Sequence, residues 1–304
     1  MNRSVRPPRC KVDGVLLLDK PGGMTSNAAL QKARWLLNAA KAGHTGTLDP
    51  MATGLLPLCF GEATKFAGTL LVADKRYEAV IRLGARTDTG DAEGEVLERR
   101  PVAVKLEQVE AALARFTGDI MQVPPMHSAL KRNGRPLYEY ARKGIEVERL
   151  PRPVTIHSLK LVSCAGDTLE IAVDCSKGTY IRTLAQDIGE LLGCGGHLTG
   201  LRRTRIASLH LESAVTLEAL EALASEARYA LLQPSDALLD GLPRANLDAV
   251  AAECFGHGQT VVEKAGQEEG LVRVYAGDHF LGLGRRLPEG CIAPERLVAI
   301  SLEK

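Results

Sequence analysis

The feature that most constrains the fold is a run of alternating side chains at residues 77–83. Alternate positions of this run carry Tyr77, Ala79, Ile81 and Leu83. A period of two predicts a β-strand with one apolar face. Two more runs, residues 154–162 and 168–174, flank a Gly-Asp turn and predict a second pair of strands.

Helical signals are interspersed with these strands. Further strands are predicted at residues 15–18, 95–97 and 203–211, and helices at residues 26–37, 62–71, 105–116, 179–192 and 216–227. Residues 41–57 have neither period, and residues 121–153 are interrupted by Pro and Gly. The pattern predicts an α+β fold: a large mixed domain with a central antiparallel or mixed sheet, followed by a small β-rich module.

The length and composition agree with this organisation. A chain of 304 residues is long enough for about two domains. Its 45% apolar and 25% charged residues exclude a collagen-like or wholly disordered chain. The composition changes beyond Gly241-Leu242-Pro243, where short apolar runs lie among glycines. We therefore predict a flexible basic arm at residues 1–13, a large domain at 14–242 and an all-β module at 245–304.

Charge and cysteine content exclude several function classes. The net charge is +1, so no protein-wide field attracts a partner. The 7 Cys are an odd number without a CxxC pair, which indicates reduced thiols in a cytoplasmic protein. His and Cys show no metal-ligand spacing, so no metal site is expected. No apolar run is long enough to span a membrane, and the basic N-terminus lacks a signal-type apolar stretch.

Residues 43–57 carry the most unusual chemistry. They place His44 and Asp49 among Gly, Thr and Pro, and Pro50 biases Asp49 away from the helical region. Loops on a rigid scaffold are common positions for catalytic groups. A turn is the alternative, because Asp-Pro is a frequent turn pair. A phosphate cradle fits poorly, because neither GxxxxGK[ST] nor GxGxxG is present.

This segment resembles the active-site loop of the TruB family, the tRNA pseudouridine-55 synthases. The resemblance continues, in the family's order, over about two thirds of the chain. Its motifs are residues 42–54 (AGHTGTLDPMATG), 14–21 (GVLLLDKP), 74–77 (DKRY), 83–89 (LGARTDT), 175–184 (CSKGTYIRTL) and 201–203 (LRR). The last 60 residues are similar, more loosely, to the family's RNA-binding PUA-type domain.

The resemblance implies an isomerase. It would break the N1–C1′ bond of a tRNA T-loop uridine, position 55, turn the uracil and rejoin it through C5, without a cofactor. Asp49 is implied as the catalytic carboxylate, and attack at C1′, attack at C6 and proton removal at C2′ all stay open. Arg182 is implied as the cation that keeps this carboxylate charged and oriented. An ordinary salt bridge is the alternative for Arg182.

The other implied site residues surround a flipped base. Tyr77 would stack on the uracil and help remove the C5 proton, although a core position is its alternative. Tyr180 and Leu201 would line the pocket, and Lys20 would support the Asp49 segment. His44 would fill the gap left by the flipped base, because imidazole can stack on bases.

Basic residues predict where the RNA backbone is held. Residues 121–153 are expected to form a mobile flap, with Lys131, Arg132, Arg135, Arg142 and Lys143 contacting phosphates. A solvated surface is the alternative. Arg202, Arg203 and Arg205 form a second basic cluster. His127 stands where many relatives of this family carry Tyr, which puts a substrate-side contact in doubt.

Two other functions compete with this interpretation. A non-catalytic RNA-binding or tRNA-folding module could use the same surfaces, and folding could also be a secondary activity of the enzyme. A glycoside hydrolase would need two paired carboxylates, and no second acid lies in a comparable motif. The expected partner is the T-arm of tRNA, with no obligatory protein partner, no membrane and a monomeric chain.

Overall fold

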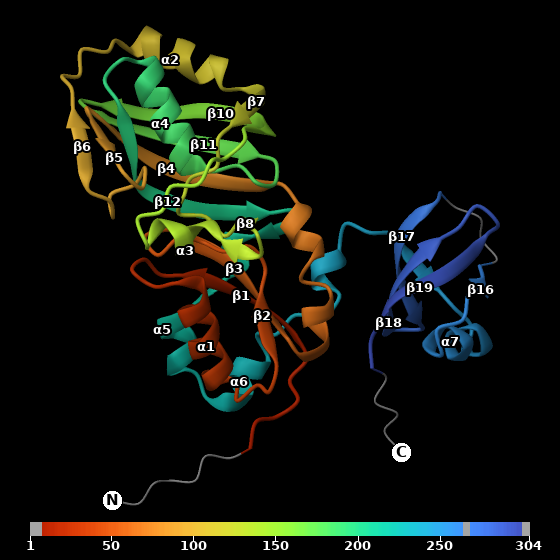
Figure 1. The fold of residues 1–304 in the computed structure, drawn as a ribbon. Helices are drawn as coiled ribbons and strands as arrows, with labels where there is room; N and C mark the ends of the chain where they lie inside the picture. Colours follow the sequence, from red (N-terminus) through yellow and green to blue (C-terminus); the bar gives the residue numbers. More distant parts are fainter. Residues whose placement is uncertain (1–7, 264–267, 300–304) are drawn as a thin grey trace, which may run out of the picture.

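The computed structural model describes residues 8–263 and 268–299 of the chain. Its centre is a mixed ten-stranded sheet (Figure 1). The strands follow one another across this sheet in the order β14 (Val215–Thr216), β1 (Gly14–Lys20), β3 (Thr53–Phe60), β12 (Gly196–Ile206), β4 (Lys75–Leu83), β11 (Thr168–Cys175), β10 (Arg152–Ala165) and β7 (Gly118–Gln122). Two short strands, β2 (Ala42–His44) and β13 (Leu209–His210), pair with β3 and β12. The predicted α+β class with a mixed sheet is confirmed.

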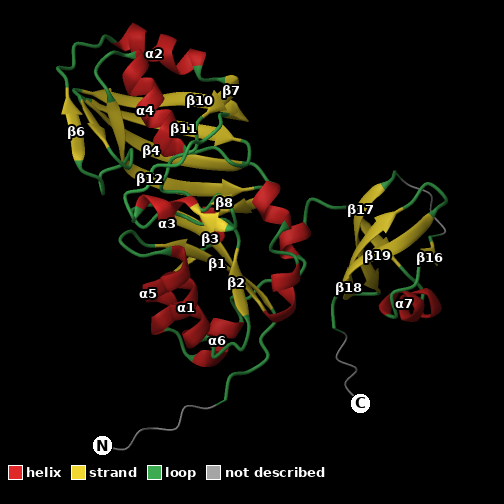
Figure 2. Ribbon diagram, viewed as in Figure 1, coloured by secondary structure: helices red, strands yellow, loops and turns green. Residues whose placement is uncertain are grey.

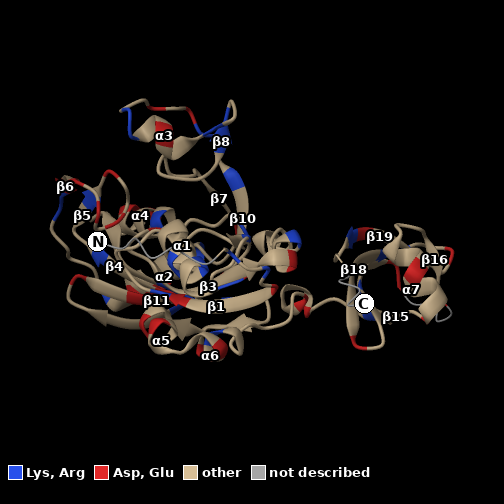
Figure 3. Cartoon of the chain, turned by 90° about the horizontal axis from the view of Figure 1, so that it is seen from below, with Lys and Arg blue, Asp and Glu red and all other residues tan. Residues whose placement is uncertain are grey.

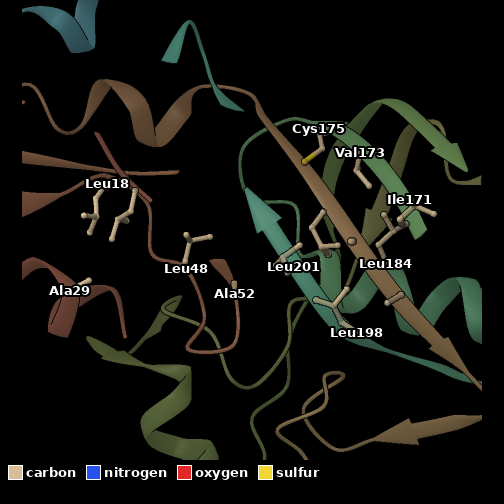
Figure 4. Packing of buried hydrophobic residues seen from close by; sticks show 14 of the residues in the cluster. Leu18, Ala29, Leu48, Ala52, Ile171, Val173, Cys175, Leu184, Leu198 and Leu201 are labelled. Atoms are coloured by element: carbon tan, nitrogen blue, oxygen red, sulfur yellow. The ribbon is translucent and has the colours of Figure 1, made fainter. Parts of the chain in front are cut away.

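Alternation along the strands decides which residues enter the main core. Leu16 and Leu18 of β1 belong to this core, whereas Val15 and Leu17 face the other side of the sheet. Four helices bury apolar side chains in the same core: α1 (Ser26–Leu36), α2 (Leu106–Arg115), α4 (Ile181–Leu191) and α5 (Leu217–Ala222). Figure 2 shows these helices against the sheet, and Figure 4 shows Leu48, Ala52, Leu184 and Leu201 inside the core. The loop that carries Asp49 is therefore packed into the core on both sides of this residue, at Leu48 and Ala52.

The opposite face of β1 and β3 is covered by irregular structure. The predicted helix at residues 62–71 is wrong: the segment forms two 3-10 helices, η1 (Gly61–Lys65) and η2 (Thr69–Val72). Gly68 separates η1 from η2, and glycine is unfavourable in a helix interior. The apolar residues nevertheless reach the core, because Phe66 and Leu70 are buried.

The C-terminal module is a small sheet with one helix. Its strands have the order β15 (Arg244–Asn246), β17 (Gly270–Ala276), β18 (His279–Arg286), β19 (Cys291–Leu297) and β16 (Val261–Val262). The expectation of an all-β module missed α7 (Ala249–Gly256), which is apolar on nearly all sides and begins at the capping residue Asp248. The Phe66 and Phe280 rings, 5.4 Å apart, join this module to the large domain.

The predicted flap region leaves the large sheet after β7. It contains a hairpin of β8 (Lys131–Arg132) and β9 (Arg135–Pro136), followed by the short helix α3 (Leu137–Ala141). Figure 3 shows α3 and β8 projecting away from the sheet. A second hairpin, β5 (Ala85–Thr87) with β6 (Val96–Arg99), lies at the far end of β4. Residues 88–95, which connect its strands, enter the site described below.

Other boundaries differ from the predictions. Residues 41–57, expected to be irregular, contain β2 and the start of β3. The strand expected at 203–211 begins at Gly196, and the helix expected at 216–227 is divided into α5 and α6 (Ser225–Tyr229). Residues 1–7 of the expected arm lie outside the described residues. Its remainder is not free, because Cys10 bridges Ala39 and its amide donates to the Asn38 carbonyl at 2.8 Å.

Two kinds of feature are absent from the described residues. No helix in the part of the chain that the structure describes is long and apolar enough to cross a membrane. The same residues contain no group of three or more His, Cys, Asp or Glu arranged to hold a metal ion.

Candidate active site

The loop between β2 and β3, residues 45–52, presents Asp49 and is called the Asp49 loop below. The side chain of Ser26, at the start of α1, bonds both backbone groups of one residue of this loop, Leu48. The Ser26 hydroxyl donates to the Leu48 carbonyl at 3.0 Å and accepts the Leu48 amide at 2.8 Å. The Gly23 amide donates to the Pro50 carbonyl at 2.9 Å. These bonds hold the backbone on both sides of Asp49, at Leu48 and at Pro50.

Lys20, at the end of β1, contacts the backbone of the same loop. Its side chain is fully buried, and its Nζ donates to the carbonyls of Pro21 at 2.7 Å, Met24 at 2.6 Å and Pro50 at 3.2 Å. Burial lowers the pKa of this amine to about 8, and the negative charge of Asp49 opposes the shift. The predicted supporting position of Lys20 beside the Asp49 loop is therefore present in the structure.

Arg182 contacts Asp49 through both carboxylate oxygens. Its Nε lies 2.9 Å from Oδ2, and its Nη2 donates to Oδ1 at 3.2 Å. The Arg182 side chain is only 5% exposed, whereas that of Asp49 is 34% exposed. This bidentate geometry leaves one side of the carboxylate open while its orientation is held.

Arg182 also contacts two further segments, residues 88–95 and the base of the flap. Its Nη1 donates to the Thr89 carbonyl at 3.2 Å and lies 3.6 Å from Oδ2 of Asp91. Its Nη2 donates to the His127 carbonyl, at the base of the flap, at 2.7 Å. One guanidinium thus connects the Asp49 loop, the loop after β5 and the flap.

Asp91 is a second carboxylate, and it is buried with several polar partners. Its side chain is 4% exposed, and its Oδ1 accepts the Thr89 hydroxyl at 2.6 Å and the Glu93 amide at 3.1 Å. A buried carboxylate with this many partners orients a cation rather than reacting. Asp91 lies in the connection between β5 and β6, and its only signal in the sequence was its charge.

Burial raises the pKa of Asp49 above its ordinary value, and the Arg182 charge opposes the shift. Asp91 acts in the same direction as burial. A group with a raised pKa is a better base once it is ionised. The site therefore contains one partly exposed carboxylate with increased basicity and a fixed cationic neighbour.

Tyr77 and Tyr180 lie close enough to this carboxylate for its charge to affect them, and Leu201 packs in the core with Leu48 and Ala52 of the Asp49 loop. Burial raises the pKa of both tyrosines, and the negative charge of Asp49 adds a small contribution in the same direction. Leu201, on β12, is 9% exposed and belongs to the main core. Tyr180 precedes α4, and Gln122 holds its backbone on both sides: Oε1 accepts the Tyr180 amide at 3.0 Å and Nε2 donates to its carbonyl at 3.3 Å. Gln122 had no signal in the sequence.

His44 ends β2, immediately before the Asp49 loop. Burial lowers the pKa of its imidazole, and the positive charge of Arg203 adds to the shift. Its Nδ1 is buried without a hydrogen-bond partner among the described residues. The imidazole is therefore neutral near pH 7 and keeps hydrogen-bonding capacity, which suits contact with a base.

The predicted basic surfaces have different outcomes. Lys131, Arg132 and Arg135 are exposed on the β8–β9 hairpin, which projects from the sheet (Figure 3). Lys131 is therefore placed on the flap and not beside Asp49. The predicted cluster on β12 is wrong: Arg203 is 1% exposed, Arg202 pairs with Asp19 at 2.7 Å and Arg205 with Asp174 at 2.7 Å. Alternation along β12 turns Arg203 inward, two positions after Leu201.

Lys20 gives a prediction for stability. Its amine has a pKa of about 8 in the folded protein, against an ordinary lysine value of 10.5. Between these values the unfolded state binds more protons, so wild type should gain stability relative to Lys20→Met as the pH rises from about 8 to 10.5. Urea unfolding of both proteins across this range measures the difference. A difference that is independent of pH would contradict the prediction, and Lys32→Met, which removes an exposed lysine, is the control.

The geometry can be compared with known proteins. Residues 34–181 match the family model “TruB family pseudouridylate synthase (N terminal domain)”. Residues 182–240 match “tRNA pseudouridylate synthase B C-terminal domain”, and residues 243–298 match “Pseudouridine synthase II TruB, C-terminal”. These three matches are consecutive and together extend over most of the chain.

Curated relatives and solved structures agree with this match. A tRNA pseudouridine synthase B of Aromatoleum aromaticum is 62% identical over 298 residues, 98% of this chain and 96% of the relative. One of Cupriavidus pinatubonensis is 58% identical, over 98% of each chain. A chain of the “Crystal Structure of a Cbf5-Nop10-Gar1 Complex” has a TM-score of 0.73 and 27% identity over 93% of this chain and 84% of its own length. A chain of an H/ACA RNP bound to a substrate RNA containing 2′-deoxyuridine has a TM-score of 0.72 and 25% identity, with the same coverage. The chain therefore belongs to the TruB family of pseudouridylate synthases.

Proposed function

We propose that this chain isomerises the T-loop uridine at position 55 of tRNA to pseudouridine, with Asp49 as the catalytic carboxylate. The whole-length relatives named tRNA pseudouridine synthase B support tRNA as the substrate. The observation that carries the catalytic assignment is the Asp49–Arg182 contact, in which both oxygens of a partly exposed carboxylate are oriented by one guanidinium. Such a group can act as nucleophile or base in each route left open, at C1′, C6 or C2′.

The surroundings of Asp49 suit a base turned out of an RNA loop. Tyr77 and Tyr180 offer aromatic rings on which uracil can stack, and Leu201 offers an apolar wall. The neutral His44, on the edge of the same loop, would occupy the position that the base leaves. Loss of stacking costs about a few kcal/mol, so such replacement contacts lower the barrier to flipping.

A glycoside hydrolase remains the poorer interpretation. Asp91 does supply a second carboxylate near Arg182, but it is 4% exposed and bonded to Thr89 and Glu93. A hydrolase needs its second carboxyl group free to protonate a leaving group or activate water. One reactive carboxylate suits an isomerisation, in which no water is consumed.

An assay on a tRNA transcript tests the function. The protein is incubated with an unmodified transcript that carries tritium at uracil C5, without added metal or nucleotide. Release of tritium is expected, because C5 exchanges its hydrogen for the bond to C1′. Replacing the T-loop uridine by cytidine should abolish release. RNA binding without release from the uridine transcript would instead favour a non-catalytic RNA-binding module.

The flap gives a second prediction. Replacing Lys131, Arg132 and Arg135 by Ala should flatten the dependence of RNA affinity on salt, because each lost phosphate contact removes roughly 0.7 from the log–log slope. Affinities at several salt concentrations measure the slope. Replacing the exposed Arg82, Arg99 and Arg115 removes the same charge elsewhere and should leave the slope unchanged. Equal slopes for the flap variant and wild type would remove these three side chains from RNA binding.

A further inference from the structure

The flap leaves the large sheet at Gln122 and returns to it at Arg152. Gln122 is the last residue of β7, Arg152 is the first residue of β10, and the two lie opposite each other in the antiparallel register. The flap between them carries the exposed basic residues of the β8–β9 hairpin (Figure 3). Gln122 itself is 2% exposed, so its side chain does not face an RNA on the flap. Its polar contacts are therefore made inside the protein.

Those contacts are with one residue, Tyr180, which immediately precedes α4. The Gln122 Oε1 accepts the Tyr180 amide at 3.0 Å, and Nε2 donates to the Tyr180 carbonyl at 3.3 Å. That carbonyl also accepts the Leu184 amide at 3.1 Å, as the first bond of the helix. The Tyr180 amide lies ahead of this ladder, and its acceptor is a side chain from another strand. Gln122 thus holds both backbone groups of Tyr180, and with them the direction in which the ring leaves the backbone.

Two further bonds join the base of the flap, residues 122–127, to the first turn of α4. The Arg182 Nη2 donates to the His127 carbonyl at 2.7 Å, and the Thr183 hydroxyl donates to the Val123 carbonyl at 3.5 Å. The start of this helix is therefore bonded to the base of the flap at three of four successive residues. The same Arg182 guanidinium orients the proposed catalytic carboxylate. The base of the flap and the partner of that carboxylate thus belong to one hydrogen-bonded unit.

We propose that Gln122 is a positioning residue, which orients the ring of Tyr180 toward the flipped uracil and fixes it relative to the flap that holds the RNA. The inference rests on the proposed function, in which Tyr180 offers a ring to the uracil. The flap begins at Gln122, so the two bonds to Tyr180 set the distance between the held RNA backbone and this ring. A misplacement of about 1 Å can lower a reaction rate about 10²-fold. Gln122 contacts neither RNA nor the reacting atoms, and it acts through Tyr180.

Gln122→Met tests this role, because it keeps the length of the side chain and removes both hydrogen bonds. It should lower kcat for tritium release roughly 10- to 100-fold. The affinity for tRNA should stay within about twofold, because the residue is buried. An unchanged kcat would overturn the proposal.

The matched control is Gln108→Met, which removes a contact of the same kind. The Gln108 Oε1 accepts the Lys105 amide at 2.8 Å in front of α2, as Gln122 does for Tyr180 in front of α4. Helix α2 contributes no side chain to the candidate site. Gln108→Met should therefore leave kcat unchanged, and a loss equal to that of Gln122→Met would overturn the proposal.

A mutant cycle distinguishes orientation of the ring from a purely structural role. Tyr180→Leu removes the ring but keeps the backbone groups that Gln122 bonds. If Gln122 acts through the ring, adding Gln122→Met to Tyr180→Leu should lower kcat by less than about twofold further. The loss of stability should be the same in both backgrounds, because the backbone contacts are the same, and urea unfolding of the four proteins measures it. Losses of kcat that multiply in the double variant would overturn the proposal.

Hydrogen exchange tests the contact without any variant of Gln122. The chain has 6 Tyr, so ¹⁵N-tyrosine labelling gives few amide resonances, and Tyr180→Phe identifies the one that belongs to Tyr180. In wild type this amide should exchange at least ~100-fold more slowly than a free peptide amide, because it donates to a buried acceptor. Exchange at the free rate would overturn the contact on which the inference depends.

Wild-type activity separates the two proposals. Wild-type protein that releases no tritium would refute the proposed function. An active wild type whose Gln122→Met variant keeps its kcat, or multiplies the loss of Tyr180→Leu, would refute only the role of Gln122.

Discussion

Replacing Asp49 by Asn is expected to abolish turnover while tRNA binding survives. The change removes the proposed nucleophile or base and should lower kcat by at least ~10³-fold. It keeps the size of the side chain and one oxygen that can accept from Arg182. Arg182 also keeps Asp91 and the Thr89 and His127 carbonyls, so no buried charge is left without partners. Tritium release from C5 and a filter-binding affinity measure the two properties separately.

The control for this variant is Asp167→Asn. Asp167 lies in the turn between β10 and β11 and pairs with Arg82 at 2.9 Å, in a surface contact of small energetic value. It should leave both turnover and affinity unchanged. If Asp49→Asn loses binding together with turnover, Asp49 is a structural residue of the loop. If the variant still helps tRNA to fold, a folding activity exists independently of the chemistry.

The strand alternation at residues 77–83 correctly predicted β4, and residues 154–174 correctly predicted the β10–β11 pair. Both are local patterns, readable because side chains on a strand repeat every two residues. The resemblance placed Asp49, Tyr77, Tyr180, Leu201 and Arg182 in one region, and the structure brings them together. The positions of His44 and Lys20 agree as well, although their roles stay predictions.

Residues that act across long sequence separations could not be predicted in this way. Asp91 meets Arg182 because the β5–β6 hairpin folds back over α4, and Gln122 meets Tyr180 from β7. Neither contact leaves a local pattern. Arg203 is different. It follows the buried Leu201 by two positions, so strand alternation could have predicted that its side chain points inward. Its neighbours Arg202 and Arg205 made the segment look like a basic surface instead.

The start of α4 also shows, at one residue, that a local pattern cannot predict a contact between distant segments. Arg182 lies in the first turn of this helix, where the backbone dipole disfavours a cation. A pattern within the helix therefore argues against Arg at this position. The conflict is resolved by Asp49 and Asp91, which come from two other segments and place two negative charges beside the guanidinium. At this position contacts between distant segments therefore outweigh the local preference of the helix.

Arg182→Met should therefore cause the second large loss. Without the guanidinium, Asp49 and Asp91 face each other as like charges, and the pKa of Asp49, already raised by burial, should rise further. In the proposed reaction Asp49 acts as the ionised carboxylate, so the acid limb of kcat should move to higher pH and kcat near neutrality should fall at least ~100-fold.

Arg182→Lys is the matched control for charge. A lysine keeps the positive charge but cannot contact Asp49 at both oxygens and also hold the Thr89 and His127 carbonyls. The acid limb should then stay near its wild-type position, because the positive charge is kept. The value of kcat should still fall, because Asp49 is no longer held in its orientation. A pH profile of Arg182→Met with an unmoved acid limb would contradict an electrostatic role. The guanidinium would then act on Asp49 through geometry alone, by fixing the Asp49 loop, residues 88–95 and the base of the flap relative to one another.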